Sequence, residues 1–181
     1  MGLLATEKPA SSPPRYLESN VATLTKDEYR VALWVNEMRR RENVGVVDQG
    51  ADRDCRELEA MAAELAAAKL FNVFPDFQWH DRNHEDLFIL GQPVDIKLCN
   101  DYGINIRWND KKQNVPDYFV FVAMYPLSER SFAFVGGIAR RDLRDEWLRK
   151  GKDGCPFYTV PTDFLTWRPY GKPVSCQCRG N

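Results

Sequence analysis

Three charged residues near the middle of the chain have the types and the spacing of a metal-binding site. Asp86 precedes an apolar run, and Asp95 and Lys97 follow a Gly-Gln-Pro segment that predicts a turn. Two carboxylates held close together repel each other unless a cation lies between them. Mg²⁺ is commonly bound by one or two carboxylates and keeps positions for water and phosphate oxygens. A neighbouring lysine can act on an attacking water or stabilise charge on a phosphate.

The residues around this trio predict a β-hairpin. Strand side chains alternate between faces, so Asp95 and Lys97 share one face of the second arm. With the turn centred on Gly91 and Gln92, opposed residues point the same way, with Cβ atoms about 5 Å apart. The predicted pairs are Ile89 with Val94, Phe88 with Asp95 and Asp86 with Lys97. The alternative is an edge hairpin with a solvated polar face, where Asp86 and Lys97 form only a cross-strand ion pair.

The order of acid, turn and Asp-x-Lys resembles the signature of the PD-(D/E)XK nuclease superfamily. Glu85 stands where the signature often has proline, and the resemblance covers about residues 53–140. It implies an α/β, restriction-endonuclease-like fold, with a mixed central sheet flanked by helices. It also implies a Mg²⁺- or Mn²⁺-dependent site that cleaves DNA. Asp86, Asp95 and the backbone carbonyl of Ile96 would bind the metal, and Lys97 would act on the attacking water.

An alanine-rich segment before the hairpin, residues 52–71, predicts a helix. Its apolar stripe is Leu58, Met61, Leu65 and Ala68, and its small side chains would let a sheet approach closely. In the superfamily such a helix usually supplies a third acidic metal ligand. Residues 62–71 resemble the pattern around that position, so Glu64 is the predicted helix acid and Glu57 the alternative. A solvated surface glutamate is the plain interpretation of either residue.

An earlier helix is predicted from a capping box formed by Thr25 and Glu28. It continues to Met38 with a stripe of Val31, Trp34, Val35 and Met38. The basic run 39–41 follows at its end. These cations suit the helix C-terminus, and they could also contact a phosphate backbone.

The rest of the chain predicts further strands at residues 102–108, 118–124, 131–139 and 157–161, and a charged helix at 140–150. Residues 118–124 form an unbroken apolar run, which is typical of a central strand covered on both faces. The resemblance implies phosphate-binding cations on exposed segments after the site. The candidates are Arg107, Lys111, Lys112, Arg140 and Arg141.

Length and composition favour one domain at residues 21–168, between a flexible segment at 1–20 and a tail at 169–181. No apolar run is long enough to span a membrane and no signal peptide is evident, so a cytoplasmic protein is expected. The net charge of -1 argues mildly against tight, non-specific DNA binding. Ordinary thiols are predicted for the five cysteines; Cys155, Cys176 and Cys178 could instead contribute to a metal or iron–sulfur site.

The functional hypothesis is a DNA nuclease, with endonuclease favoured, of the kind associated with phages and with restriction or repair. A homodimer would allow both strands to be cut. The alternative is a catalytically inactive nucleic-acid-binding or protein-interaction module on the same fold. The sequence leaves open endo- against exonuclease action, substrate specificity, oligomeric state and biological pathway.

Overall fold

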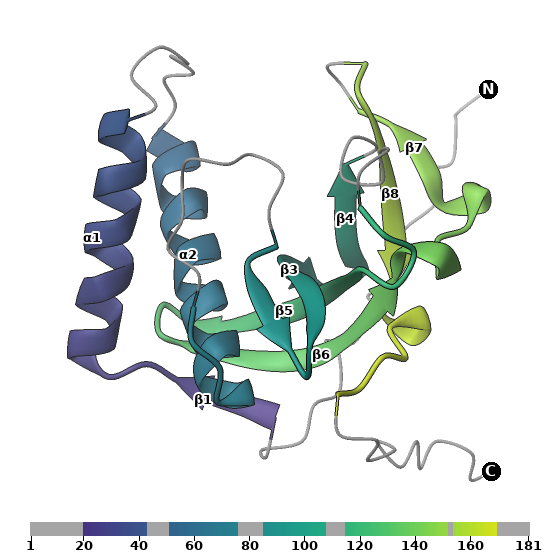
Figure 1. Cartoon of the computed structure of the whole chain (residues 1–181). Coiled ribbons are helices and arrows are strands. Elements are labelled where there is room, and N and C mark those ends of the chain that lie inside the picture. Colours follow the sequence, from purple (N-terminus) through teal and green to yellow (C-terminus); the bar gives the residue numbers. More distant parts are fainter. Residues whose placement is uncertain (1–19, 43–50, 76–84, 108–114, 152–153, 170–181) are drawn as a thin grey trace, which may run out of the picture.

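The computed structural model describes residues 20–42, 51–75, 85–107, 115–151 and 154–169. It contains two long helices, α1 (Lys26–Glu42) and α2 (Ala51–Phe71), beside a sheet of eight strands (Figure 1). The strands are β1 (Val21–Thr23), β2 (Leu87–Ile89), β3 (Gln92–Asn100), β4 (Gly103–Arg107), β5 (Val120–Ser128), β6 (Ser131–Ala139), β7 (Leu148–Lys150) and β8 (Pro156–Pro161). The predicted α/β class is confirmed.

The sheet is mixed, and β3 is its central strand. Strands lie in the order β1-β6-β5-β3-β4-β8-β7, with β2 also paired to β3. The β3–β5 pair is parallel, and the other pairs are antiparallel. β2 pairs with β3 as far as Val94, and β4 pairs with it only from Cys99. Between these two residues, one edge of β3 is without a strand partner in the described part of the chain.

Two hydrophobic cores lie on opposite faces of the central strands. On one face α2 packs on β1, β2, β3, β5 and β6, and its buried alanines bring the helix close to the sheet. On the other face, side chains of β4 and β8 pack against the opposite side of β5 and β6. Figure 1 shows the helices on one side of the central strands and β4, β8 and β7 on the other. The sheet therefore has two halves. α2 covers the half with β1, β6, β5 and β3, and β4 and β8 of the other half pack against the opposite side of β5 and β6.

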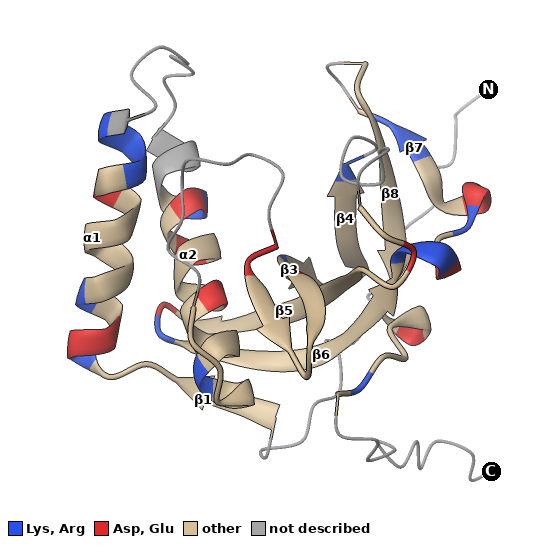
Figure 2. Cartoon of the chain, in the orientation of Figure 1, with Lys and Arg blue, Asp and Glu red and all other residues tan. Residues whose placement is uncertain are grey.

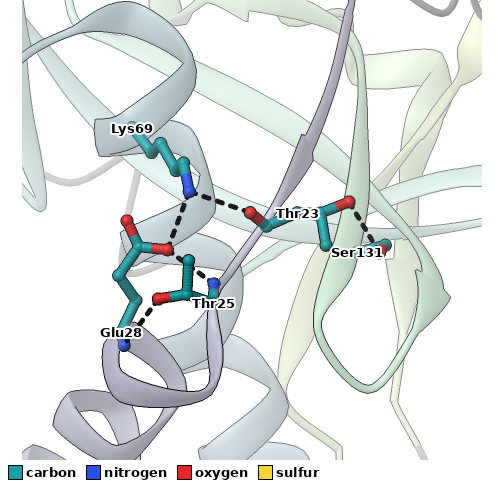
Figure 3. Close-up of polar contacts among 5 residues, drawn as sticks. All are labelled: Thr23, Thr25, Glu28, Lys69 and Ser131. Atoms are coloured by element: carbon teal, nitrogen blue, oxygen red, sulfur yellow. Dashed lines mark hydrogen bonds and ion pairs between the residues drawn. The ribbon is translucent and has the colours of Figure 1, made fainter.

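The capping box predicted for α1 is confirmed and is part of a larger polar network (Figure 3). The Thr25 N–H donates to Glu28 Oε2 at 2.6 Å, and the Glu28 N–H donates to Thr25 Oγ1 at 3.2 Å. Lys69, near the end of α2, donates to the same Glu28 carboxylate at 2.7 Å and to the carbonyl of Thr23 at 3.0 Å. The Lys69 ammonium thus joins three elements: the start of α1, the end of α2 and β1.

The predicted buried stripe of α1 is wrong at two positions. Ala32 and Val35 are fully buried, whereas Val31 is 40% exposed and Trp34 is 57% exposed. α1 packs on α2 and not directly on the sheet, so only a narrow line of its surface is covered. The buried line runs through Ala32, Val35 and Asn36, so it is turned around the helix relative to the predicted stripe.

The predicted helix at 140–150 is also wrong. The chain there forms two short 3-10 turns, Arg140–Asp142 and Asp145–Trp147, followed by β7. Trp147 is buried, with its ring 5.0 Å from that of Phe164 and the Arg144 guanidinium 5.2 Å above it. Pairing of β7 with β8 and burial of this tryptophan outweigh the local helix propensity of the charged residues. The four other predicted strands are confirmed.

Gly103 closes the turn that carries β3 into β4. Asn100 Oδ1 accepts hydrogen bonds from the N–H groups of Tyr102 and Gly103, at 3.0 and 3.1 Å. Gly103 has φ +145°, and a Cβ there would lie 1.8 Å from the carbonyl oxygen of Val160 on β8. Only glycine allows this close approach of β4 to β8.

Gly103→Ala should therefore lower the free energy of unfolding by about 3 kcal/mol or more, measured by urea denaturation. Gly91→Ala is the control, because φ is also positive there but no atom lies within 4 Å of the added Cβ. It should cost only about 1–2 kcal/mol of backbone strain. Equal losses in the two variants would show that backbone contact with Val160 is not the constraint.

Candidate active site

The hairpin is present, but its register differs from the prediction by two residues. Observed partners are Leu87 with Val94, Phe88 with Pro93 and Ile89 with Gln92. The turn therefore consists of Leu90 and Gly91, with φ of 52° and 76°. A two-residue hairpin turn of this kind requires positive φ at both positions. A shift of two residues preserves alternation, so the predicted face of each side chain is unchanged.

Asp86 lies next to Asp95 instead of next to Lys97. Its N–H donates to the Val94 carbonyl at 2.8 Å, directly beyond the last β2–β3 pair, Leu87 with Val94. Asp86 Oδ2 accepts a hydrogen bond from the Ile96 N–H at 2.6 Å, and the charge of Asp95 acts on the Asp86 carboxyl group. The side chain of Asp86 thus occupies the strand-free edge of β3.

Lys97 and Asp95 form an ion pair on β3. Lys97 Nζ lies 2.7 Å from Asp95 Oδ2, and the two side chains are 23% and 19% exposed. They point away from α2, because the alternate residues Val94 and Ile96 belong to the core beneath that helix. Both charged groups are partly shielded from water but remain accessible to a ligand.

Glu64 approaches the same edge from α2. It is only 8% exposed, and its Oε1 and Oε2 accept hydrogen bonds from the Arg39 guanidinium at 3.4 and 3.2 Å. Its charge acts on Asp86, and the charges of Asp95 and Lys97 act on it in turn. Glu64 is therefore the helix acid near the hairpin, where the sequence alone had left Glu57 as an alternative.

The protonation of these acids reflects their burial. Burial raises the pKa of Asp86 well above its ordinary value of 3.8, and the charges of Glu64 and Asp95 raise it further. Burial also raises the pKa of Glu64, although the Arg39 guanidinium opposes this rise. Asp86 and Glu64 are therefore both harder to ionise in the folded protein than in the unfolded chain.

The donor set is suited to a hard divalent cation, because it consists only of oxygen atoms. The N–H of Ile96 points to the strand-free edge, and in a strand the carbonyl of the same residue points to the same side. In the described ranges, however, no three acidic, histidine or cysteine side chains are already arranged around a metal position. Arg39, the Ile96 N–H and Lys97 each engage one of the acids instead.

The predicted phosphate-binding residues are not all in one place. Arg107 is exposed at the end of β4, and Arg141 is exposed in the turn after β6. Arg140 Nη1 lies 3.9 Å from Asp117 Oδ1. Lys111 and Lys112 lie outside the described residues. Arg39 was predicted as a helix-end cation that could also contact a phosphate backbone. Its contact with Glu64 could not be read from the sequence, because the contact depends on how α1 packs on α2.

Three of the five cysteines lie in the described part of the chain. Cys55 and Cys155 are exposed, and Cys99 is buried, which together with the charge of Asp101 raises the pKa of its thiol to about 12. Cys176 and Cys178 lie outside the described residues. The cysteine-site alternative therefore stays a prediction.

Comparison of the chain with protein-family models, with curated proteins and with solved structures found no significant match. In the described part of the chain, no helix is long and apolar enough to cross a membrane. Inference about function therefore depends on the geometry of the strand-free edge of β3 with Glu64, Asp86, Asp95 and Lys97, which we call the acidic edge.

Asp86→Asn should stabilise the protein at pH 7 in the presence of EDTA. The pKa of Asp86 is raised in the folded state, so ionising the carboxyl costs stability as the pH rises through that value. The asparagine amide removes this cost. Its oxygen can still accept a hydrogen bond from the Ile96 N–H, and its N–H₂ group can donate to the Asp95 carboxylate. The Tm should rise by about 2–4 °C for each kcal/mol recovered, and the difference from wild type should vanish near pH 4.

Asp117→Asn is the matched control, because that side chain is 80% exposed. Its Tm should follow wild type between pH 4 and pH 7 in thermal scans. A Tm of Asp86→Asn below wild type at pH 7 would contradict the idea that the buried carboxylate is destabilising.

Proposed function

We propose that this chain is a metal-dependent DNA nuclease that hydrolyses phosphodiester bonds, with endonuclease action favoured. The supporting observation is that Glu64, Asp86 and Asp95 come together beside Lys97 at the strand-free edge of β3. Two neighbouring elements, a helix and a hairpin, supply these groups. Three acids gathered at one edge favour a bound cation, which would add to the counter-charge that Arg39 and Lys97 already supply.

In this proposal Glu64, Asp86, Asp95 and the Ile96 carbonyl would hold Mg²⁺ or Mn²⁺. The ion would activate a water molecule and neutralise charge on the scissile phosphate. Lys97 is within 2.7 Å of Asp95, so its ammonium can orient the attacking water or stabilise the phosphate oxygens. Arg39 is a further cation at the site, and it would be available to a phosphate once Glu64 has another counter-charge.

The fold supports the proposed restriction-endonuclease-like assignment at the level of a mixed sheet with adjacent helices. Its centre is an antiparallel hairpin joined to a parallel strand, with the acid-bearing helix packed on them. One departure is evident in the described residues. Both long helices lie on one face, whereas β4 and β8 cover the other.

The alternative function is an inactive nucleic-acid-binding or protein-interaction module. It is favoured by the engagement of all three acids with protein groups, which stabilises the site without a metal. Such a module would need no divalent cation and would leave DNA intact.

The test is cleavage of plasmid and linear DNA in Mg²⁺, Mn²⁺ or EDTA. Asp95→Ala and Lys97→Ala should each lower the metal-dependent cleavage rate about 100-fold or more, because each removes a group that acts on the transition state. Glu64→Gln should also lower it. Glu57→Gln, on the same helix and two turns earlier, should cleave like wild type.

Circular dichroism and thermal unfolding would establish that each variant is folded. Cleavage that survives in both Asp95→Ala and Lys97→Ala would refute the assigned site. Binding of DNA without cleavage in any of the metals would instead support the inactive module.

A further inference from the structure

The strands β4, β8 and β7 have one buried and one open face. Ile104, Ile106, Tyr158 and Val160 are fully buried and form part of the second core. Their neighbours along the strands alternate to the opposite side. We call this side the open face; its members are Asn105, Arg107, Arg149, Phe157 and Thr159. The open face carries cations, polar groups and one aromatic ring.

Two arginines flank the aromatic ring in a straight row across three strands. Arg107 on β4 is opposite Phe157 on β8, and Phe157 is opposite Arg149 on β7. Directly opposed side chains point the same way, and neighbouring strands are about 4.8 Å apart. The two guanidinium groups are exposed, and the ring between them is half-buried. None of the five members of the open face is acidic.

Hydrogen bonds hold two of these side chains in defined positions. Thr159 Oγ1 donates to Asn105 Oδ1 at 3.1 Å, which turns the amide N–H₂ group of Asn105 away from Thr159. Arg149 Nη1 donates to the carbonyls of Glu146 and Leu148, at 2.8 and 3.0 Å. Ordered donors of this kind lose less conformational entropy when they bind a partner.

The open face lies on the α2 side of the sheet. β3 runs directly into β4, and the alternation along both strands puts Arg107 on the same side of the sheet as Ile96 and on the opposite side from Asp95 and Lys97. α2 lies on the side of Ile96, but it packs only as far across the sheet as β3. Figure 2 shows acidic segments on α2 and at the start of β2, and basic segments at the end of β4 and along β7.

We propose that the open face binds single-stranded DNA. Arg107 and Arg149 would contact phosphates, Phe157 would stack on a base, and Asn105 would donate a hydrogen bond. Phosphate binding by cations and base stacking on an aromatic ring are the two interactions that single-stranded DNA offers every partner. An unpaired segment is required because the bases of a duplex are stacked on each other. This inference rests on the proposed nuclease function and adds its substrate class.

The test measures fluorescence anisotropy of labelled 20-nucleotide DNA, single-stranded or duplex, in EDTA. The variant Arg107→Ala/Arg149→Ala should bind the single strand at least about 10-fold more weakly, and the slope of log K against log salt should fall by about 1.4. Phe157→Ala should weaken single-strand binding about 5-fold or more and leave duplex binding unchanged. Arg107→Lys/Arg149→Lys should restore most of the salt dependence.

Lys26→Ala/Arg30→Ala is the matched control, because it removes the same charge from exposed positions on α1. It should bind single-stranded DNA like wild type. An equal loss in the control would overturn the inference, since net charge alone would then explain binding. Unchanged binding by Phe157→Ala, or wild-type preference for duplex over single strand, would also overturn it.

The two proposals can fail separately. If wild type binds single-stranded DNA through the open face but cleaves nothing in any metal, the open face is supported and the nuclease is refuted. If cleavage depends on Asp95 and Lys97 while Arg107→Ala/Arg149→Ala binds and cuts like wild type, the nuclease stands and the open-face inference is refuted.

Discussion

The structure around the acidic edge depends on one electrostatic constraint, which is that three carboxylates lie together in a poorly solvated place. Burial and mutual repulsion raise the pKa of Asp86 and of Glu64. The protein meets this cost with three separate devices: the Arg39 guanidinium, the Ile96 N–H and the Lys97 ammonium. Each of these three groups is bound to a different acid: Arg39 to Glu64, the Ile96 N–H to Asp86 and Lys97 to Asp95.

The strand-free edge exists because β3 belongs to two parts of the sheet. Its first residues pair with β2 and its last with β4, and these partners leave in different directions. A hairpin partner that continued along β3 would have occupied the Ile96 N–H and left no place for Asp86 to lie. Gly103 allows the close approach of β4 to Val160 of β8, at the point where β4 leaves β3.

Local chemistry made much of this arrangement predictable. The two-residue period of a strand put Asp95 and Lys97 on one face, and the parity of the hairpin put Asp86 with them, although the register was two residues off. The capping box of Thr25 and Glu28 and the spacing of Glu64 in an alanine-rich helix are also short-range features. The helix predicted at 140–150 failed because long-range pairing of β7 with β8 outweighed local preference.

The sequence by itself determined which residues could form a metal site, because side-chain type and strand alternation are properties of neighbouring residues. Only the structure decided that Leu87 pairs with Val94 and that Asp86 accepts from the Ile96 N–H, since the register depends on positive φ at Leu90 and Gly91. Tertiary structure alone also brought Arg39 to Glu64 across 25 residues and set Arg107, Phe157 and Arg149 in one row. Such contacts depend on packing between elements, which no local pattern specifies.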